Sequence, residues 1–343
     1  MSGEEQRMRP MGIADILDET VELYKSSFVL LVGIAAVMHV PYSILETWQT
    51  NRMMAMVAPS GQPPTSPSAA FAALGMAVLG LAYLLLLSPF VTGALTFAIS
   101  ERYLSRQVSI AGSFKRVFRL AMFGRLLLAI GIKMVVVAVP AMLLAVAFGL
   151  GTVGAMTSST GLIVLAVVLG LLGLPAAGAA IYLLLRLSVL ETSLVVENSG
   201  IGLALTRTWS LMRGNLLKCF VLVVIAGAVT FLLQMILQQP TKAVIASGIA
   251  KGVSASFVIV IIDALIAAVS SAVLAPVLSI VTILLYYDIR IRKEGFDLEL
   301  LAAELDAKAR QAGVWNAQPL PREEMPVEQT TEQAPPESES SPE

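Results

Sequence analysis

Six apolar segments, separated by short polar ones, limit the folds that this chain can adopt more than any other feature of its sequence. A helix needs about 20 apolar residues to cross roughly 30 Å of hydrocarbon, and each segment is near or beyond that length. Hydrophobic residues make up 57% of the chain and charged residues only 14%, which excludes an ordinary soluble domain. We therefore predict an all-α polytopic membrane protein. The six transmembrane helices are expected at about residues 28–45, 69–100, 125–150, 161–185, 216–237 and 254–287.

The stretch from Pro276 to Arg290 shows a pattern that recurs from Pro89 to Glu101 and from Pro175 to Arg186. A proline lies inside an apolar segment, and the first charge follows only after a further apolar run, where a helix is expected to leave the bilayer. Tyr286 and Tyr287 precede this exit in the last copy. Because tyrosine rings have an apolar and a polar end, we expect both at the level of the lipid headgroups.

An amphipathic segment precedes each pair of apolar segments. Apolar residues recur at helical spacing around Leu17, Phe114 and Leu205, with charged residues on the opposite face. These three residues lie 97 and 91 positions apart. The spacing predicts three units, each an amphipathic surface helix followed by a membrane hairpin. The alternative is chance, because prolines are common in membrane helices and amphipathic stripes can arise independently.

The segments between the apolar runs are predicted as loops, turns and surface segments. Residues 46–68 contain APSGQPPTSPS, whose prolines and small polar residues favour an extended loop, and Pro41 is expected to end or kink the helix before it. QQPTKAVIASGIAKG, residues 238–252, is predicted as a short turn. Residues 187–199 are too short to cross a bilayer, and we expect them to lie along the membrane surface.

The distribution of basic residues predicts the orientation of the chain. With the N-terminus in the cytoplasm, nineteen lysines and arginines lie inside and three outside, and basic residues resist translocation. Both termini are therefore expected in the cytoplasm. The predicted organisation is a cytoplasmic N-terminus with an amphipathic helix over 1–27, a membrane domain over 28–287, a cytoplasmic helix over 288–311 and a disordered acidic tail over 312–343.

Three polar residues fall inside the apolar segments, where each is costly to keep and is therefore a candidate functional group. His39 and Asp263 are expected at a similar depth, so a contact between them in a substrate or proton path is one hypothesis. The alternative is structural burial or an interfacial position. Lys133 lies about eight residues, roughly 12 Å, inside its apolar segment, and its stem is expected to extend back toward the inner surface.

Six bases near the expected cytoplasmic surface are candidates for contact with lipid headgroups or a partner protein, because anionic headgroups attract them. They are Lys115, Arg116, Arg119, Arg186, Arg207 and Arg213. We expect membrane lipids as partners, with another membrane or cytoplasmic protein as a further candidate, and no nucleic acid.

The sequence offers little material for catalysis. Its single cysteine, Cys219, excludes an internal disulfide and a cysteine-rich metal site, and its single histidine is His39. It contains no nucleotide-binding loop, no HExxH and no GxSxG motif. We expect no enzyme activity, no metal site and no cofactor.

Three segments carry a resemblance to a known family. They are RPMGIADILDETVELYKSSF from Arg9, VVENSGIGLALTRTWSLMRGNLLKCFVL from Val195 and LLYYDIRIRKEGFDLELL from Leu284. Together they resemble the glycerophosphoryl diester phosphodiesterase membrane domain of bacterial inner-membrane proteins. The matching positions that carry polar or aromatic chemistry include Glu197, Arg207, Trp209, Asp288, Arg290, Arg292 and Glu294.

This resemblance implies a multi-pass protein of the bacterial inner membrane, and it does not carry the phosphodiesterase reaction. The catalytic domains fused to such membrane domains use a pair of histidines, which a chain whose single histidine is His39 cannot supply. Two function classes follow. The first is a non-catalytic membrane scaffold or partner protein that contacts lipid headgroups, and the second is a permease for a lipid or small amphiphile that uses the proline breaks and the intramembrane polar residues.

Overall fold

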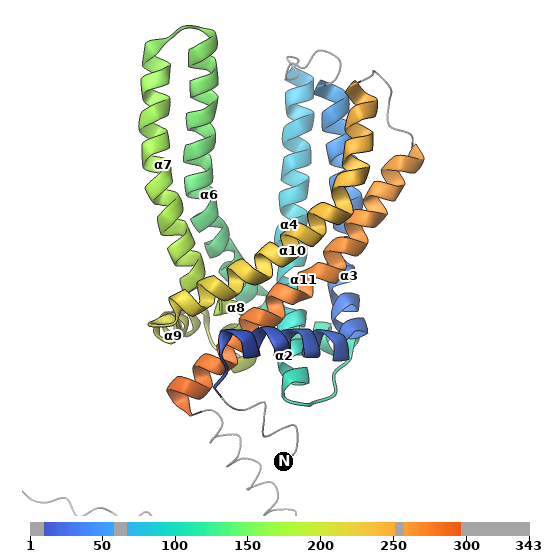
Figure 1. Ribbon diagram of the computed structural model, residues 1–343, viewed down its shortest axis with the longest axis vertical. Coiled ribbons are helices and arrows are strands. Elements are labelled where there is room, and N and C mark those ends of the chain that lie inside the picture. Colours follow the sequence, from blue (N-terminus) through green and yellow to red (C-terminus); the bar gives the residue numbers. More distant parts are fainter. Residues whose placement is uncertain (1–9, 58–66, 251–256, 296–343) are drawn as a thin grey trace, which may run out of the picture. The chain divides into compact units, whose positions relative to one another are not determined.

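Helices form the whole of the regular structure in the computed structural model, which describes residues 10–57, 67–250 and 257–295. No strand occurs in these ranges. The elements in chain order are α2 (Ile13–Ser26), α3 (Phe28–Val57), α4 (Pro67–Tyr103), α5 (Ile110–Val117), α6 (Leu120–Met156), α7 (Thr160–Arg186), α8 (Leu190–Glu197), α9 (Ile201–Met212), α10 (Leu216–Ala250) and α11 (Phe257–Glu294). Figure 1 shows their arrangement.

Six of these helices, α3, α4, α6, α7, α10 and α11, are long and apolar enough to cross a membrane. Their outward side chains are largely leucine, valine, isoleucine and phenylalanine, which lipid tails solvate well. A helix satisfies its own backbone hydrogen bonds, so it is one of the few structures that can cross hydrocarbon. The predicted all-α multi-pass architecture is confirmed.

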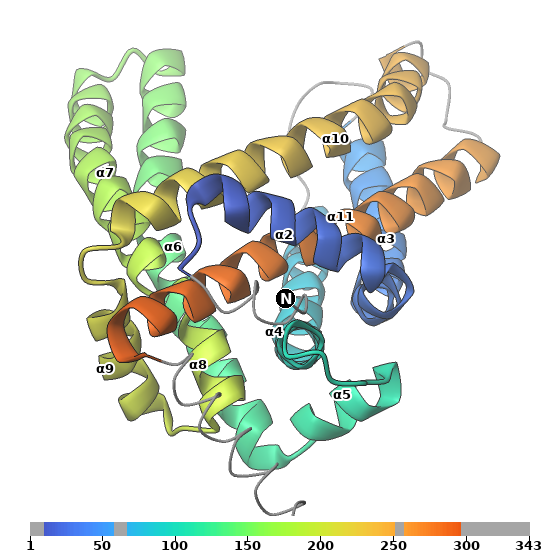
Figure 2. The same ribbon diagram turned by 60° about the horizontal axis from the view of Figure 1, so that its bottom comes forward.

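The order of a surface helix followed by two long helices occurs three times. The surface helices α2, α5 and α9 begin at residues 97 and 91 positions apart and precede the pairs α3–α4, α6–α7 and α10–α11. All three lie at the same end of the long helices, which we call the surface-helix end (Figures 1 and 2). The first long helix of each pair also contains a proline, at Pro41, Pro140 and Pro240, and these prolines lie 99 and 100 residues apart.

Two of the predicted interruptions are helical. Helix α3 continues through Pro41 to Val57, and α10 continues through Pro240 to Ala250, so the predicted turn at 238–252 is wrong over its described part. The predicted loop at 46–68 is likewise helical at both ends, and residues 58–66 lie outside the described part. A proline inside a membrane helix is tolerated where a neighbour satisfies the freed backbone groups.

Two tyrosine hydroxyls donate to a carbonyl next to the one that a proline frees. Tyr83 on α4 donates to the carbonyl of Met38, three residues before Pro41, at 3.1 Å. Tyr24 on α2 donates to the carbonyl of Val273, three residues before Pro276, at 2.8 Å. In both cases the proline lacks the N–H that would bond to the carbonyl four residues earlier, and its ring crowds that turn. The tyrosine hydroxyl, from another helix, bonds to the next carbonyl along the chain.

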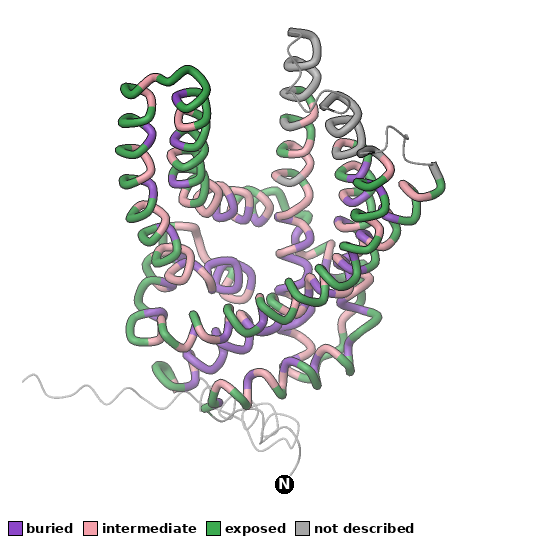
Figure 3. Tube along the Cα trace, turned by 45° about the horizontal axis from the view of Figure 1, so that its top comes forward, coloured by how far each residue is buried: buried purple, intermediate pink, exposed green. Residues whose placement is uncertain are grey.

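The segment predicted along the membrane surface at 187–199 is instead inside the protein. It forms the short helix α8, and its residues from Leu190 to Val195 are all buried between α4, α6 and α9. Glu191 binds Lys133 there, and Ser193 donates to Glu197, so both side chains have partners within the protein. Helix α8 thus fills the interior of the surface-helix end, as the buried residues in Figure 3 show.

The core is built around the last turns of α11. Almost every residue from Ile280 to Ile289 is buried against α2, α3, α4, α8 and α10. Tyr286 and Tyr287 are both 0% exposed, so their predicted place among the lipid headgroups is wrong. Tyr287 packs against the ring of Tyr103 at a centroid distance of 5.0 Å. The aromatic rings are interior packing groups at this position.

The α6–α7 pair is held together by small residues. A Cβ added at Gly173 would lie 2.6 Å from Leu144 Cδ2, and one added at Gly154 would lie 2.9 Å from Ile163 Cγ1. Close backbone approach through glycine and alanine is a usual basis of helix association in lipid. The other faces of both helices expose large apolar side chains along most of their length.

Candidate functional site

The carboxylate of Asp288 on α11 is the centre of a buried polar cluster at the surface-helix end. Its side chain is 0% exposed. Oδ1 accepts the backbone N–H of Met11 at 2.7 Å, and Oδ2 accepts Lys218 Nζ at 2.5 Å. Arg292 Nε, one turn later on α11, lies 3.0 and 3.2 Å from the two oxygens. Two cations and a backbone donor therefore compensate the buried charge.

The same two cations also hold the carbonyl of Met11. Lys218 Nζ donates to this oxygen at 2.6 Å, and Arg292 Nη2 donates to it at 2.8 Å. Met11 lies just before α2, Lys218 is near the start of α10, and Arg292 is near the end of α11. The cluster therefore fixes the segment that enters the first surface helix against the last two long helices.

Glu197, the last residue of α8, is the centre of a second cluster. Its Oε1 accepts the hydroxyl of Tyr286 at 2.5 Å and also Nε of Arg207 from α9. Arg207 Nη2 reaches Glu294 at 2.8 Å, and Arg290 Nε donates to the same Glu294 oxygen at 3.1 Å. Burial lowers the pKa of the Arg207 guanidinium, but its hydrogen bond to Glu197 and the nearby Glu294 outweigh this and raise the pKa above its usual value.

Cations from other elements cover the carboxyl end of α9. The Arg186 guanidinium lies over the Trp209 ring at 4.7 Å and donates to the Trp209 carbonyl at 3.1 Å. Lys293 Nζ donates to the carbonyls of Ser210 and Arg213 at 3.0 and 2.7 Å. The last carbonyls of a helix carry partial negative charge, so this arrangement stabilises α9 in place. Trp209 acts here as a stacking partner for Arg186.

The three polar residues of the apolar segments lie in separate surroundings. Lys133 on α6 pairs with Glu191 of the buried helix α8, with Nζ and Oε2 2.5 Å apart. Asp263 on α11 accepts the hydroxyl of Thr241 on α10 at 2.6 Å. Among the described residues, no hydrogen bond or ion pair joins His39 to Asp263 or to Lys133. The structure therefore does not assemble them into one site.

The pair α10–α11 carries a row of further polar contacts beside Asp263. Gln238 Nε2 donates to Ser270 Oγ at 3.1 Å, and Gln234 Nε2 lies 3.4 Å from Ser271 Oγ. Lys242 Nζ donates to Gln238 Oε1 at 2.9 Å. Such side chains hold neighbouring membrane helices together, so this pair uses polar contacts where α6–α7 uses small residues.

The six bases predicted at the lipid surface divide into two kinds. Arg186 and Arg207 are partly buried and bind groups of the protein itself, as described above. Lys115, Arg119 and Arg213 have exposed side chains. The guanidinium of Arg116 lies 5.9 Å from the centre of the Phe97 ring. The prediction from charge alone did not separate these two kinds.

Sequence reasoning missed several members of the clusters. Lys218 and Glu191 were not singled out, although each is a charge within or beside an apolar run, which was an available signal. The contacts of Met11 could not be predicted from the sequence, because they are made by its backbone N–H and carbonyl. Among the described residues, no group of three or more histidine, cysteine, aspartate or glutamate side chains is placed to hold a metal ion.

Comparison with family models gives one match, and it extends over residues 11–289. The matching family is described as a domain of unknown function (DUF7847). The chain belongs to this family. The DUF7847 region begins at Met11 and ends one residue after Asp288, so it includes both partners of the buried contact between them. Neither the curated proteins nor the solved structures gave a match.

Proposed function

We propose that this DUF7847 protein is a non-catalytic scaffold of the bacterial inner membrane, which presents its surface helices to lipid headgroups and to a partner protein. The strongest support is that charged residues at the surface-helix end form ion pairs between different elements. Asp288, Glu197 and Glu294 bind cations from other elements and thereby hold α2, α8 and α9 to the end of α11. Charges used in this way build a rigid platform.

The orientation belongs to the same proposal. Bases gather at the surface-helix end, and basic segments are retained in the cytoplasm during insertion, so this end faces the cytoplasm. Both termini then lie on that side. The resemblance of the motifs around Glu197 and Asp288 to the membrane domain of glycerophosphoryl diester phosphodiesterases supports the bacterial inner membrane as the location.

A permease for a lipid or small amphiphile is the second candidate, and the α10–α11 pair is the observation that favours it. Asp263 is buried in the apolar part of α11 with the hydroxyl of Thr241 as its hydrogen-bond donor. A buried carboxyl in a membrane span is often part of a path for ions, protons or substrate. The contacts of Gln238 and Ser270 continue the polar row along the same helices.

A flux measurement separates the two functions. We expect vesicles containing the full-length protein to move neither a fluorescent phospholipid analogue nor glycerol 3-phosphate faster than protein-free vesicles. Flux in the wild type that Asp263→Asn abolishes, while a Ser247→Ala control keeps it, would establish the permease and reject the scaffold.

The scaffold also makes a positive prediction about contacts. A photo-crosslinker at Asp18, which is exposed on α2, is expected to capture one defined protein in native membranes. The same crosslinker at Thr157, in the turn between α6 and α7 at the opposite end, is the matched control and is expected to capture none. Equal capture at both positions would contradict a partner surface at the surface-helix end.

A further inference from the structure

The bases at the surface-helix end differ in whether the protein itself neutralises them. Lys218 and Arg292 bind Asp288, Arg207 and Arg290 bind Glu294, and Lys133 binds Glu191. Four bases, on α4, on α5 and at the N-cap of α6, have no such partner among the described residues. They are Arg102, Lys115, Arg116 and Arg119, and we call them the α4–α5 basic corner.

Two members of this corner have a buried donor without an acceptor. The Nε atoms of Arg102 and Arg116 are both inaccessible to solvent and make no hydrogen bond. The Arg116 guanidinium lies over the Phe97 ring of α4, which holds its side chain toward the helix pair. Buried N–H groups are nearly always paired in folded proteins, so both guanidinium groups keep donor capacity that no atom of the described residues uses. Phosphate and carboxylate are the anions whose geometry matches guanidinium donors, and phosphate is the one that lipid headgroups carry.

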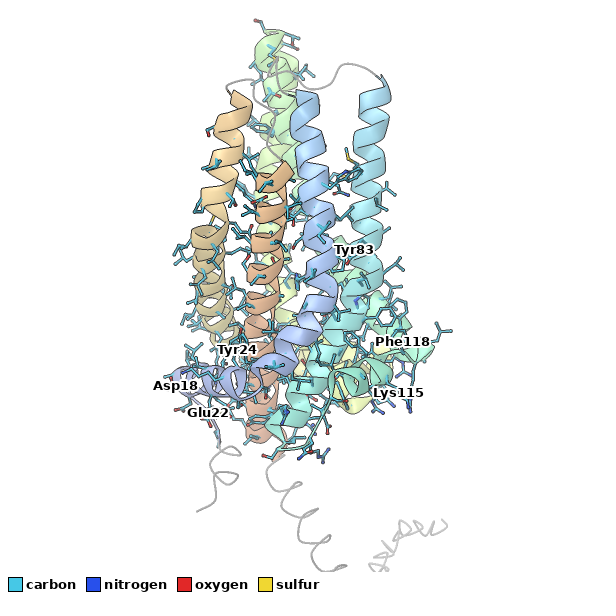
Figure 4. The ribbon with its side chains drawn as sticks, turned by 90° about the vertical axis from the view of Figure 1, so that its right-hand side faces the viewer. Asp18, Glu22, Tyr24, Tyr83, Lys115 and Phe118 are labelled. Atoms are coloured by element: carbon cyan, nitrogen blue, oxygen red, sulfur yellow. The ribbon has the colours of Figure 1, made fainter. Side chains whose placement is uncertain are left out.

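Large apolar side chains stand next to these bases. Phe118 is 68% exposed and Leu120 is 85% exposed, although both lie within five residues of Lys115. Figure 4 shows Phe118 and Lys115 projecting from the same side of the molecule, with Phe118 higher in the view, whereas Asp18 and Glu22 of α2 lie on the opposite side. Apolar side chains on the membrane side and bases on the water side match the two parts of a phospholipid.

We infer that the α4–α5 basic corner binds the phosphate of an anionic phospholipid, whose acyl chains cover Phe118 and Leu120. This inference rests on the proposed function, because it names the lipid class and the residues through which the scaffold contacts the membrane. A lipid is preferred over free phosphate because free phosphate leaves both apolar side chains in water. The α2 side of the same end carries Asp18 and Glu22 and is not part of the site.

The test uses the full-length protein, purified in detergent and stripped of bound lipid, with phosphatidylglycerol as the anionic probe and phosphatidylcholine as the zwitterionic one. Native mass spectrometry measures the fraction bound as each lipid is titrated. We expect tight binding of phosphatidylglycerol only. Each base near anionic headgroups contributes about fivefold in affinity, so Lys115→Gln with Arg119→Gln is expected to weaken binding by roughly twenty-five-fold.

Arg102→Gln with Arg116→Gln is the second variant, and we expect a loss of similar size because it also removes two positive charges from the corner. Lys25→Gln removes an exposed base of α2 at the same end and is the matched control, for which no change is expected. The first variant replaces exposed side chains only, so it remains informative if the second does not fold.

Three results would overturn the inference. They are unchanged binding in the Lys115 and Arg119 variant, equal binding of phosphatidylcholine, and displacement of the lipid by millimolar inorganic phosphate. These results are distinct from failure of the proposed function, which is decided by flux. A protein that transports a solute and still binds phosphatidylglycerol at this corner would reject the scaffold and keep the lipid site.

Discussion

The carboxylate of Asp288 accepts a hydrogen bond from the backbone N–H of Met11, a residue 277 positions earlier in the chain. Lys218 and Arg292 bind both the carboxylate and the Met11 carbonyl, so four groups from three parts of the chain share one buried cluster. This contact closes the surface-helix end and joins the first surface helix to the last long helix.

Replacing Asp288 is expected to destabilise the protein strongly. Asp288→Asn removes the charge that neutralises Lys218 and Arg292, and removal of one partner of a buried ion pair typically costs about 3–5 kcal/mol. Since the Arg292 side chain is 43% exposed, the lower end of that range is expected. Thermal unfolding in detergent measures the effect, and Asp18→Asn on the exposed face of α2 is the control. Equal stability of both variants would show that the cluster does not hold the fold.

The Lys133–Glu191 pair is expected to show strong coupling in a double-mutant cycle. Lys133→Met and Glu191→Gln should each lower the unfolding temperature, because each leaves one charge without its partner beside the buried helix α8. The double variant should cost less than the sum of the two, by about 1–3 kcal/mol. Additive effects would mean that the two side chains do not interact in the membrane.

The hydroxyl of Tyr24 is expected to stabilise α11 around Pro276. Tyr24→Phe removes one hydrogen bond to the Val273 carbonyl and should cost about 1 kcal/mol. In a Pro276→Ala background the helix regains its own backbone bond, and the same substitution should cost less. Unfolding curves of the four proteins test this. An equal cost in both backgrounds would show that the contribution of the hydroxyl does not depend on Pro276.

The same bond predicts a dependence on alkaline pH. Burial raises the pKa of the Tyr24 phenol above its ordinary value of about 10. Because the folded-state pKa is the raised one, the stabilisation is complete below about pH 10 and is lost as the pH rises through the folded-state value. The difference in unfolding temperature between wild type and Tyr24→Phe should therefore shrink only above that pH. A difference that shrinks already near neutrality would contradict this assignment.

The α6–α7 pair offers a test of packing with a control on the same helix. Gly173→Val places new atoms against Leu144 and is expected to cost about 1–3 kcal/mol, as overpacking usually does. Gly178→Val meets open space on α7 and should cost less. A cysteine pair across the two helices, oxidised in membranes, measures their separation. Equal crosslinking yields in both variants would show that Gly173 is not at the interface.

Cysteine labelling tests the predicted orientation. The native Cys219 is buried and gives little background. An impermeant maleimide added to right-side-out spheroplasts is expected to label Thr157→Cys, between α6 and α7, and to leave Asp18→Cys on α2 unlabelled until the membrane is opened. Labelling of Asp18→Cys in intact spheroplasts would reverse the orientation.

Periodicity and composition predicted the architecture because membrane helices must satisfy their own backbone and expose apolar side chains. The spacing of Leu17, Phe114 and Leu205 therefore predicted where the three surface helices lie. The ends of α3 and α10 were missed, since the effect of Pro41 or Pro240 depends on neighbouring groups such as the Tyr83 hydroxyl.

The polar clusters were predicted only as a set of residues. Glu197, Arg207, Asp288 and Arg292 were singled out, but a sequence does not show which charges meet across α8, α9 and α11. Tyr286 illustrates the limit, because a tyrosine before a charged run suits a headgroup position as well as a buried bond to Glu197.

The contact between Met11 and Asp288 also has a consequence for biosynthesis. A ribosome produces the amino-terminal half of this contact first and its carboxyl-terminal half only after five long helices have been made. The first surface helix touches α3 and α10 as well, but it lacks most of its contacts until the sixth long helix arrives. Its docking is one of the last steps of assembly, and a nascent chain cut short before α11 would leave α2 without its anchor.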